Sequence, residues 1–317
     1  MAAEAVVLTG PTGAGKSEWA ERLAAELPIE IVSVDSALVY RGMDIGTAKP
    51  DAALRARIPH HLIDIRDPAE VYSAGEFVAD ATRLLEEIRA RGRLPLLVGG
   101  TMLYLRALVE GIADLPRACE PLRREIEARA AREGWPRLHA ELARVDAEAA
   151  ASIHPNDPQR IQRALEVCHL TGGRFSELRR TGGSRHAALP RIALVPGDRQ
   201  ALNRRLVERL SHMMEHGFLE EVARLRARGD LTARHPALRA VGYRQLWAHL
   251  EGAYGLGEAN ERALAATRQL AKRQLTWLRA DRAVRWIDPG VGGAFEALKC
   301  DLRRELVGPW LPHGGSW

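Results

Sequence analysis

An octapeptide near the start of the chain constrains its fold more than any other feature. Residues 10–17 read Gly-Pro-Thr-Gly-Ala-Gly-Lys-Ser and match the pattern G-x-x-x-x-G-K-[ST] in full. The apolar run AVVLTG ends at Gly10, and a helical pattern follows from Ser17 to Leu27. A strand, a glycine-rich loop and a helix in this order form a cradle of backbone N–H groups for phosphate. The octapeptide therefore predicts an α/β fold that binds a diphosphate or a triphosphate.

Two side chains of this loop add chemistry to the backbone cradle. Only four of the 46 basic residues are lysines, so in this arginine-rich chain Lys16 marks a place that needs a compact, mobile ammonium. Ser17 supplies a hydroxyl that can ligate Mg²⁺. The residues expected at the phosphates are Gly10, Pro11, Thr12, Gly13, Ala14, Gly15, Lys16 and Ser17.

The rest of the chain alternates between strand and helix patterns. Further apolar runs at 29–34, 94–100, 191–197 and 284–288 predict strands of a doubly wound parallel sheet. Residues 114–190 have a helical period and no convincing strand, which indicates an all-helical insertion domain. The predicted organisation is a P-loop NTPase-like core at 1–113 and 191–317. After the strand near residue 194 the chain is expected to be helical again, with long amphipathic segments at 199–228 and 258–282.

Charge and composition narrow the location and the partners. The 317 residues carry a net charge of +5, and no apolar run approaches the roughly 18 residues of a membrane span. The first twenty residues lack the pattern of a secretory leader, so we expect a cytoplasmic protein without a membrane partner. Arg268, Lys272 and Arg279 share one face of the last long helix, which suits a nucleic-acid backbone. A chain with 42 arginines also places some of them together by chance.

A carboxylate is expected beside the phosphate loop. The second predicted strand ends at Val34 and is followed by Asp35 and Ser36. Ligands of doubly wound sheets bind at the carboxyl ends of the strands. Asp35 is therefore a candidate metal ligand or general base, and the alternative is a carboxylate that caps a turn or a helix.

Several longer motifs resemble those of one family, the bacterial tRNA dimethylallyltransferases (tRNA isopentenyltransferases). The resemblance covers roughly residues 6–287, and its blocks occur in the order of the family. They lie at 10–17, 35–50, 60–64, 99–104, 154–163, 241–245 and 267–274.

This resemblance implies a reaction, a metal and catalytic residues. The family transfers a dimethylallyl group from dimethylallyl pyrophosphate to N6 of the adenosine just 3′ of a tRNA anticodon, with Mg²⁺. Asp35 is then the base that takes the N6 proton, and Thr101 forms hydrogen bonds with the reacting groups. Lys16 and Arg209 neutralise the pyrophosphate, although Arg204 and Arg205 lie close to Arg209 in the sequence.

The resemblance also implies contacts with the anticodon stem-loop of tRNA. Because a stacked adenine cannot reach a buried cradle, the base must be flipped into a channel. A channel within one chain needs no second copy, and we expect a monomer. The residues implied at the tRNA are Asp35, Ser36, Ala37, Leu38, Thr101, Arg123, Gln159, Arg160, Ile161, Gln162, Arg163, Arg239, Ala240, Val241, Gly242, Tyr243 and Arg244.

Two other functions are compatible with the same core. The phosphate loop also occurs in nucleotide and small-molecule kinases, which move phosphate from ATP to an acceptor. A non-catalytic RNA-binding NTPase would combine the loop with the basic surface. Without the resemblance, residues 159–163 read equally well as a solvated helix face.

Overall fold

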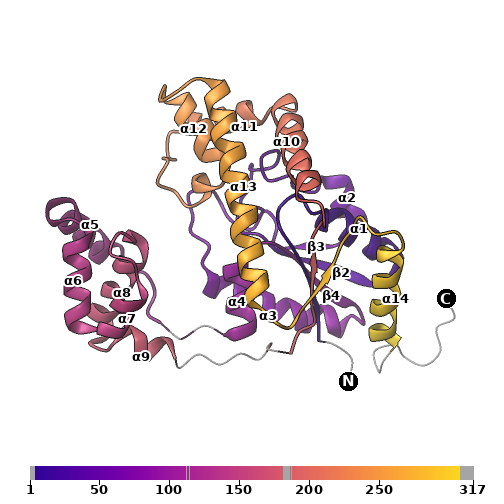
Figure 1. Cartoon of the computed structure of the whole chain (residues 1–317), viewed down its shortest axis with the longest axis horizontal. Helices are drawn as coiled ribbons and strands as arrows, with labels where there is room; N and C mark the ends of the chain where they lie inside the picture. The colour runs from indigo at the N-terminus through magenta and orange to yellow at the C-terminus, as the bar shows by residue number, and fades with distance from the viewer. Residues whose placement is uncertain (1–3, 112, 114, 181–185, 187, 308–317) are drawn as a thin grey trace. The chain divides into compact units, whose positions relative to one another are not determined.

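The chain folds into two compact units. The computed structural model describes all residues except 1–3, 112, 114, 181–185, 187 and 308–317 (Figure 1). The first unit comprises the described residues of 1–107 and 188–317, and the second those of 108–187. The sequence predicted bounds of 114–190 for the helical unit. Its start lies earlier because the last turn of α4 (Met102–Glu110) belongs with it.

A six-stranded parallel sheet lies at the centre of the first unit, with the strands in the spatial order β3-β2-β4-β1-β5-β6. This confirms the predicted α/β class, and all five predicted strands are present. The sixth, β3, has only two residues and carries no apolar run that a sequence pattern could reveal. The strands are β1 (Val6–Thr9), β2 (Ile29–Val34), β3 (His60–His61), β4 (Leu94–Gly99), β5 (Arg191–Leu194) and β6 (Val284–Ile287).

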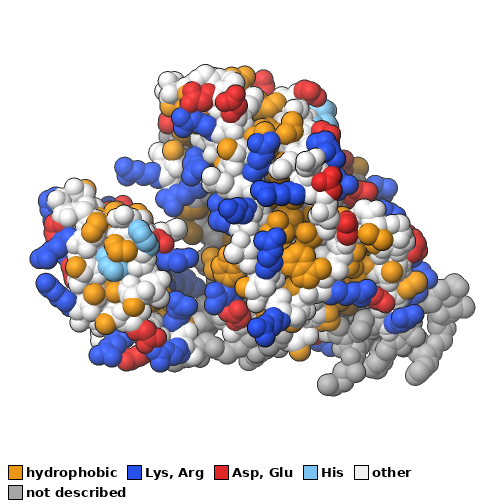
Figure 2. Space-filling view, in the orientation of Figure 1, with side chains coloured by type: hydrophobic (Ala, Val, Ile, Leu, Met, Phe, Trp, Pro, Cys, Tyr) orange, Lys and Arg blue, Asp and Glu red, His pale blue; other side chains and the backbone are white. Residues whose placement is uncertain are grey.

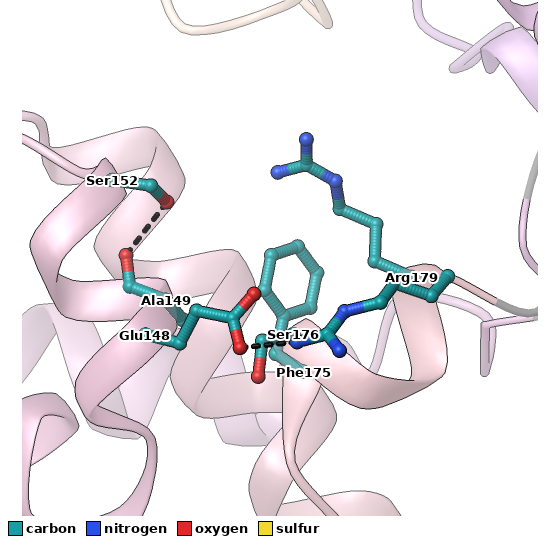
Figure 3. Close-up of a pocket in the computed structure, with 7 residues that line it drawn as sticks. Glu148, Ala149, Ser152, Phe175, Ser176 and Arg179 are labelled. Carbon is teal, nitrogen blue, oxygen red and sulfur yellow. Dashed lines mark hydrogen bonds and ion pairs between the residues drawn. The ribbon is translucent and has the colours of Figure 1, made fainter.

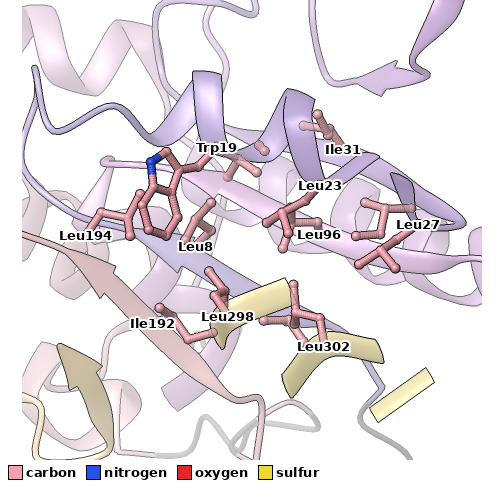
Figure 4. Close-up of a cluster of buried hydrophobic side chains, with 14 of the residues drawn as sticks. Leu8, Trp19, Leu23, Leu27, Ile31, Leu96, Ile192, Leu194, Leu298 and Leu302 are labelled. Carbon is pink, nitrogen blue, oxygen red and sulfur yellow. The ribbon is translucent and has the colours of Figure 1, made fainter. Parts of the chain in front are cut away.

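Helices cover both faces of the sheet. On one face, α1 (Lys16–Glu26) and α14 (Ala294–Val307) bury Leu23 and Leu298 against Leu8 and Ile192 (Figure 4). Side chains alternate along a strand, so Ala193 points to the opposite face. There it packs against α4 and against α13 (Leu256–Ala280). The sheet is thus a buried layer whose carboxyl edge carries the loops.

The remaining helices of this unit are α2 (Ala52–Arg57), α3 (Ala74–Ala90), α10 (Arg199–Glu215), α11 (Phe218–Ala227), α12 (Tyr243–Leu250) and the short 3₁₀ turn at Ala237–Arg239. The amphipathic segment predicted at 199–228 is helical, and it forms two helices, α10 and α11. Gly217 adopts φ +94° between α10 and α11, and this left-handed conformation ends the first helix. Among the described residues, every helix is too short or too polar to span a bilayer.

The described part of the second unit is entirely helical, as expected. Its own core contains Ile126, Leu138, Leu142, Ile161 and Leu165. Asp146 fixes the packing of two of its helices, because its buried carboxylate accepts hydrogen bonds from Ala149 and Ser176. The helices are α5 (Glu120–Glu133), α6 (Trp135–Val145), α7 (Ala147–Ser152), α8 (Pro158–Thr171) and α9 (Phe175–Arg179).

Two glycines allow the carboxyl ends of neighbouring strands to approach closely. A Cβ added at Gly99, at the end of β4, would lie 2.1 Å from the carbonyl oxygen of Val34 in β2. A Cβ at Gly10, just after β1, would lie 2.2 Å from the carbonyl oxygen of Leu194 in β5. Because the obstructing atoms are backbone, only glycine fits at either position.

Substitution of Gly99 tests this close approach. We expect Gly99→Ala to destabilise the first unit by about 1–3 kcal/mol, because the backbone of β2 has to shift. Gly75→Ala is the matched control: its Cβ would lie 3.8 Å from the Ser73 hydroxyl, in ordinary contact, at the start of α3. Alanine there should leave stability unchanged or raise it. Urea midpoints measure both changes, and equal midpoints for the two variants would contradict the packing described.

Candidate active site

The phosphate-binding loop joins β1 to α1 at the carboxyl edge of the sheet. Gly13 and Gly15 adopt φ angles of +80° and +88°, which side chains with a Cβ rarely tolerate. Gly15 is the N-cap of α1, so the first N–H groups of that helix have no partner within it and are available to an anion. The local conformation is therefore the one that the octapeptide predicts.

The ammonium of Lys16 lies against the loop itself. Its Nζ donates to the carbonyl oxygens of Gly10 at 3.0 Å and Pro11 at 2.8 Å. Burial lowers the pKa of Lys16 to about 8, the positive charge of Arg209 lowers it as well, and Asp35 opposes both. A dianion bound in the loop would favour the charged ammonium and raise this pKa again.

Arg209 reaches the same place from α10. Its Nη2 donates to the carbonyl oxygen of Thr47 at 3.3 Å. Desolvation lowers the pKa of Arg209, and the charge of Asp35 raises it. Arg204 pairs instead with Asp198, so the charge that couples to both Lys16 and Asp35 is that of Arg209.

Asp35 begins the turn that follows β2. One carboxylate oxygen, Oδ1, accepts hydrogen bonds from the N–H groups of Ala37 at 2.8 Å and Leu38 at 3.3 Å. Within the described residues, the other oxygen has no hydrogen-bond partner. The capping role that the sequence left open is therefore real, but it occupies one oxygen and leaves Oδ2 free to accept a proton.

Thr101 ties the end of β4 to this turn. Its N–H donates to the carbonyl oxygen of Val34 at 3.1 Å, and its Oγ1 accepts from the N–H of Ser36 at 3.0 Å. The hydroxyl thus fixes the residue next to Asp35. Four predicted residues from separate stretches of sequence thus come together at one edge of the sheet: Lys16, Asp35, Thr101 and Arg209.

A buried glutamate that the sequence analysis missed organises the neighbouring loop. Glu221 of α11 is 2% exposed, and its carboxylate accepts from the N–H groups of Asp44, Ile45 and Gly46 at 2.8–3.1 Å. It thereby orders the loop whose next residue, Thr47, receives Arg209. The missed signal is a charged residue at an apolar helical position, three residues after Phe218 and one before Val222.

The structure leaves the Tyr243 side chain no surface with which to contact tRNA. Its ring is fully buried against Phe218, with centroids 4.9 Å apart, and its hydroxyl donates to Glu221. Burial, followed by the charge of Glu221, raises the pKa of Tyr243. Around it, Gly242 is buried, Ala240 and Val241 are partly buried, and Arg239 and Arg244 are exposed. A role in RNA binding stays a prediction for the two arginines and the backbone between them.

In the second unit, two of the predicted tRNA residues are committed to a buried carboxylate. Glu166 is fully buried and accepts from Arg123 at 2.9 and 3.1 Å, from Arg163 at 2.7 Å and from the N–H of Cys119 at 2.7 Å. These bonds hold the pKa of Glu166 below its usual value, against the effect of burial. Arg123 and Arg163 therefore have a structural role within the unit.

The rest of the 159–163 segment divides in the same way. Ile161 is buried in the core, and Gln162 bonds to the carbonyl of Arg123 and to Glu127. Gln159 and Arg160 are exposed at the start of α8. RNA contact stays a prediction, and these two are the exposed side chains of the segment that could make it.

Exposed basic side chains accompany α13, as the helical spacing predicted. Arg268, Lys272 and Arg279 are all exposed. Figure 2 shows several arginine and lysine side chains over the face along which α13 runs. This surface belongs to the unit that carries the phosphate loop.

A small cavity of 150 Å³ in the second unit takes no part in this arrangement. Figure 3 shows Glu148 at its wall and the ring of Phe175 beside it. Glu148 forms an ion pair with Arg180, which also lines the cavity. No predicted site residue lines it. Its lining residues are Glu148, Ala149, Ser152, Phe175, Ser176, Arg179 and Arg180.

Comparisons with known proteins agree with the resemblance drawn from the motifs. A protein from Methylococcus capsulatus (strain Bath) named tRNA dimethylallyltransferase is 57% identical over 305 residues, which is 95% of this chain and 97% of that protein. The crystal structure of a tRNA isopentenylpyrophosphate transferase from Bacillus halodurans is 38% identical and superposes with a TM-score of 0.68, covering 95% of this chain and 96% of that one.

A eukaryotic dimethylallyltransferase acting on tRNA has a related fold. The match has a TM-score of 0.75 at 27% identity and covers 90% of this chain and 73% of the eukaryotic one. Residues 38–281 match the family described as IPP transferase. The predicted family and the predicted fold are both confirmed: this chain belongs to the IPP transferase family.

Proposed function

We propose that this chain transfers the dimethylallyl group of dimethylallyl pyrophosphate to N6 of the adenosine immediately 3′ of a tRNA anticodon and releases pyrophosphate. Membership of the family and the names of the relatives support a tRNA dimethylallyltransferase activity. The structural observation that carries the chemistry is the free Oδ2 of Asp35, placed within electrostatic reach of Lys16 and Arg209.

The phosphate loop, Lys16 and Arg209 form the donor half of this proposed site. As the bond between C1 of the dimethylallyl group and oxygen breaks, negative charge grows on the pyrophosphate. Preorganised cations and N–H groups stabilise that charge.

Mg²⁺ fits the donor half through Ser17. This hydroxyl is exposed and has no hydrogen-bond partner among the described residues. The described residues also hold no cluster of three or more His, Cys, Asp or Glu side chains. Mg²⁺ commonly binds through few protein ligands and the phosphates of its substrate, so Ser17 with the pyrophosphate oxygens would suffice. When bound, the ion supplies charge neutralisation of the leaving group.

Asp35 and Thr101 form the acceptor half. The lone pair of N6 forms the new bond to C1 while the C–O bond breaks, and the N6 proton moves to Oδ2 of Asp35. The amine is a weak nucleophile because its lone pair is delocalised into the ring, so a base on N6–H both orients and activates it. Thr101 holds the turn by accepting the hydrogen bond of Ser36, and we assign to its hydroxyl a further hydrogen bond with the reacting groups.

The target adenosine of the tRNA reaches the acceptor half when it is flipped out of the stacked anticodon loop. We propose that Ser36, Ala37 and Leu38 line the entry of the flipped adenosine. Exposed basic side chains then hold the neighbouring phosphates, and those we assign to this are Arg160, Arg239, Arg244 and the exposed residues of α13. One chain carries both halves of the proposed chemistry, so a monomer stays our expectation. A location in the cytoplasm also stays an expectation.

Asp35→Asn tests the role of Asp35 as a base separately from its role in the turn. Asparagine keeps an oxygen that can accept from Ala37 and Leu38, but it cannot take a proton. We expect the single-turnover rate of dimethylallyl transfer to fall by about 10²–10⁴-fold, with the affinity for tRNA within about threefold of the wild type. Transfer of radiolabel to tRNA and filter binding measure the two quantities.

Asp35→Ala removes the turn contacts as well and serves as the comparison. If Asp35→Asn transferred the dimethylallyl group at the wild-type rate, Asp35 would not be the general base. Parallel assays with labelled ATP distinguish the other two functions. Phosphate moved from ATP to an acceptor would indicate a kinase, and ATP hydrolysis without any transfer would indicate an RNA-binding NTPase.

The lowered pKa of Lys16 predicts how affinity for the donor depends on pH. Below pH 8 the ammonium is charged before the donor binds, and affinity should be constant. Above pH 8 binding has to take up a proton, because the bound diphosphate favours the charged form, so affinity should fall by up to about tenfold per pH unit.

Calorimetry with dimethylallyl pyrophosphate between pH 7 and 9.5 tests this dependence. The terminal phosphate of the donor, like that of a phosphate monoester, has a last pKa of about 6, so it is about nine-tenths ionised at pH 7 and almost fully ionised above pH 8. Lys16→Arg keeps its charge throughout and should give a flat profile. A flat profile in the wild type as well would show that Lys16 does not titrate at the donor.

Two arginines of α8 should respond differently to substitution. Arg160 is 67% exposed and pairs with Asp157 at the surface, so Arg160→Gln should leave Tm unchanged and weaken tRNA binding. The slope of log affinity against log salt should fall by about one. Arg163→Gln leaves buried Glu166 with one partner fewer and should cost about 2 kcal/mol of stability. Melting curves and salt titrations measure these changes. A lower Tm in Arg160→Gln but not in Arg163→Gln would contradict the prediction.

A further inference from the structure

One buried side chain connects the two halves of the proposed site. Gln274 lies on α13 and is 6% exposed. Its Oε1 accepts from the N–H of Thr12, in the phosphate loop, at 2.8 Å. Its Nε2 donates to the carbonyl oxygen of Gly100, at the end of β4, also at 2.8 Å.

The two partners fix both the orientation and the identity of this side chain. A backbone N–H can only donate and a carbonyl can only accept, so the amide oxygen of Gln274 has to face Thr12 and its NH₂ has to face Gly100. A glutamate could accept from Thr12 but could not donate to Gly100 when ionised. A methionine would fill the space and make neither bond.

The packing around Gly100 shows how tightly this bridge is built. A Cβ added there would lie 2.3 Å from Nε2 of Gln274 and 3.4 Å from the carbonyl oxygen of Gly10. A side chain at position 100 would therefore displace the amide of Gln274, which occupies that space. The bridge brings the end of β4 and the phosphate loop into direct proximity.

Each end of the bridge leads to a different reactant. Thr12 belongs to the loop that binds the diphosphate. Gly100 precedes Thr101, whose hydroxyl holds Ser36 in the turn that Asp35 begins. The chain of contacts from donor to acceptor is therefore short, and Gln274 is its central member.

We propose that Gln274 is a positioning residue that sets the separation between the bound pyrophosphate and the base that receives the N6 proton. This inference rests on the proposed function. Transfer between two bound groups requires reacting atoms about 3–3.5 Å apart, and a displacement of 1 Å costs about 10²-fold in rate. A bridge that holds both halves acts on that distance without touching either reactant.

The outer face of α13 does not take part in this bridge. At 100° per residue, Arg268, Lys272 and Arg279 lie about 120–160° around the helix from Gln274. A substitution of Gln274 therefore affects the phosphate loop and the end of β4, and it leaves the exposed basic residues of α13 in place. This separation permits a test in which rate and tRNA affinity respond differently.

The experiment measures single-turnover transfer from dimethylallyl pyrophosphate to unmodified tRNA in the full chain. Gln274→Met, which removes both bonds, should lower the rate at saturating substrates by about 30–100-fold. Gln274→Glu, which loses the bond to Gly100, should also slow it. The affinities for tRNA and for the donor should stay within about threefold. Gln200→Glu adds the same charge at an exposed position of α10 and should match the wild type.

A purely structural role gives a different result. Melting temperature and both affinities would fall together, while the rate of the folded, saturated fraction would stay within twofold of the wild type. That outcome would overturn the proposal.

A double-mutant cycle gives a second approach. Gly100→Ala forces the end of the Gln274 side chain to move, so it should slow transfer by itself. Combined with Gln274→Met it should add little further loss, because both changes break the same bridge. Fully additive losses would show that the two residues act independently.

Hydrogen exchange separates this inference from the function on which it rests. In Gln274→Met the N–H of Thr12 loses its partner and should exchange faster, whether or not the protein transfers a prenyl group. If the wild type fails to prenylate tRNA, the proposed function is wrong. If Thr12 exchanges at the same rate in the variant, the bridge itself is wrong.

Discussion

The parallel pairing of β1 with β4 and β5 is the constraint on which the rest of the site depends. It directs the carboxyl ends of the strands toward one edge. There the carbonyl groups of Leu194 and Val34 lie so close to Gly10 and Gly99 that neither glycine could carry a side chain. A phosphate loop, a carboxylate turn and a threonine then meet without long connections. The arrangement of the proposed site follows from strand order more than from any single contact.

Buried polar side chains complete what strand order begins. Glu221 satisfies three backbone N–H groups of the loop that supports Arg209, and Gln274 joins the phosphate loop to the end of β4. Each lies on a helix distant in sequence from the loop it holds. Leaving such groups unpaired inside a protein is costly, so the loops and helices stabilise one another. The same principle operates in the helical unit, where Glu166 receives two arginines.

Local patterns predicted much of this molecule. The octapeptide gave the loop, apolar runs gave five of the six strands, and Asp35 was placed by its position after the second strand. Prediction failed where the signal was short or long-range. The two residues of β3 have no pattern of their own, and Gly217 divides a continuous amphipathic stretch into two helices. The resemblance assigned Tyr243 to RNA together with the other residues of 239–244, whereas its ring lies in the core.

The sequence by itself determined the family, the α/β class and the conformation of the phosphate loop, because motifs and apolar runs consist of residues that lie together in the chain. Only the tertiary structure decided which charges couple. It placed Arg209 near Lys16 and Asp35, committed Arg123 and Arg163 to Glu166, and joined Gln274 to Thr12 across 262 positions. Hydrogen bonds and burial depend on distance in space, and distance in space between remote segments is fixed only when the whole sheet has formed.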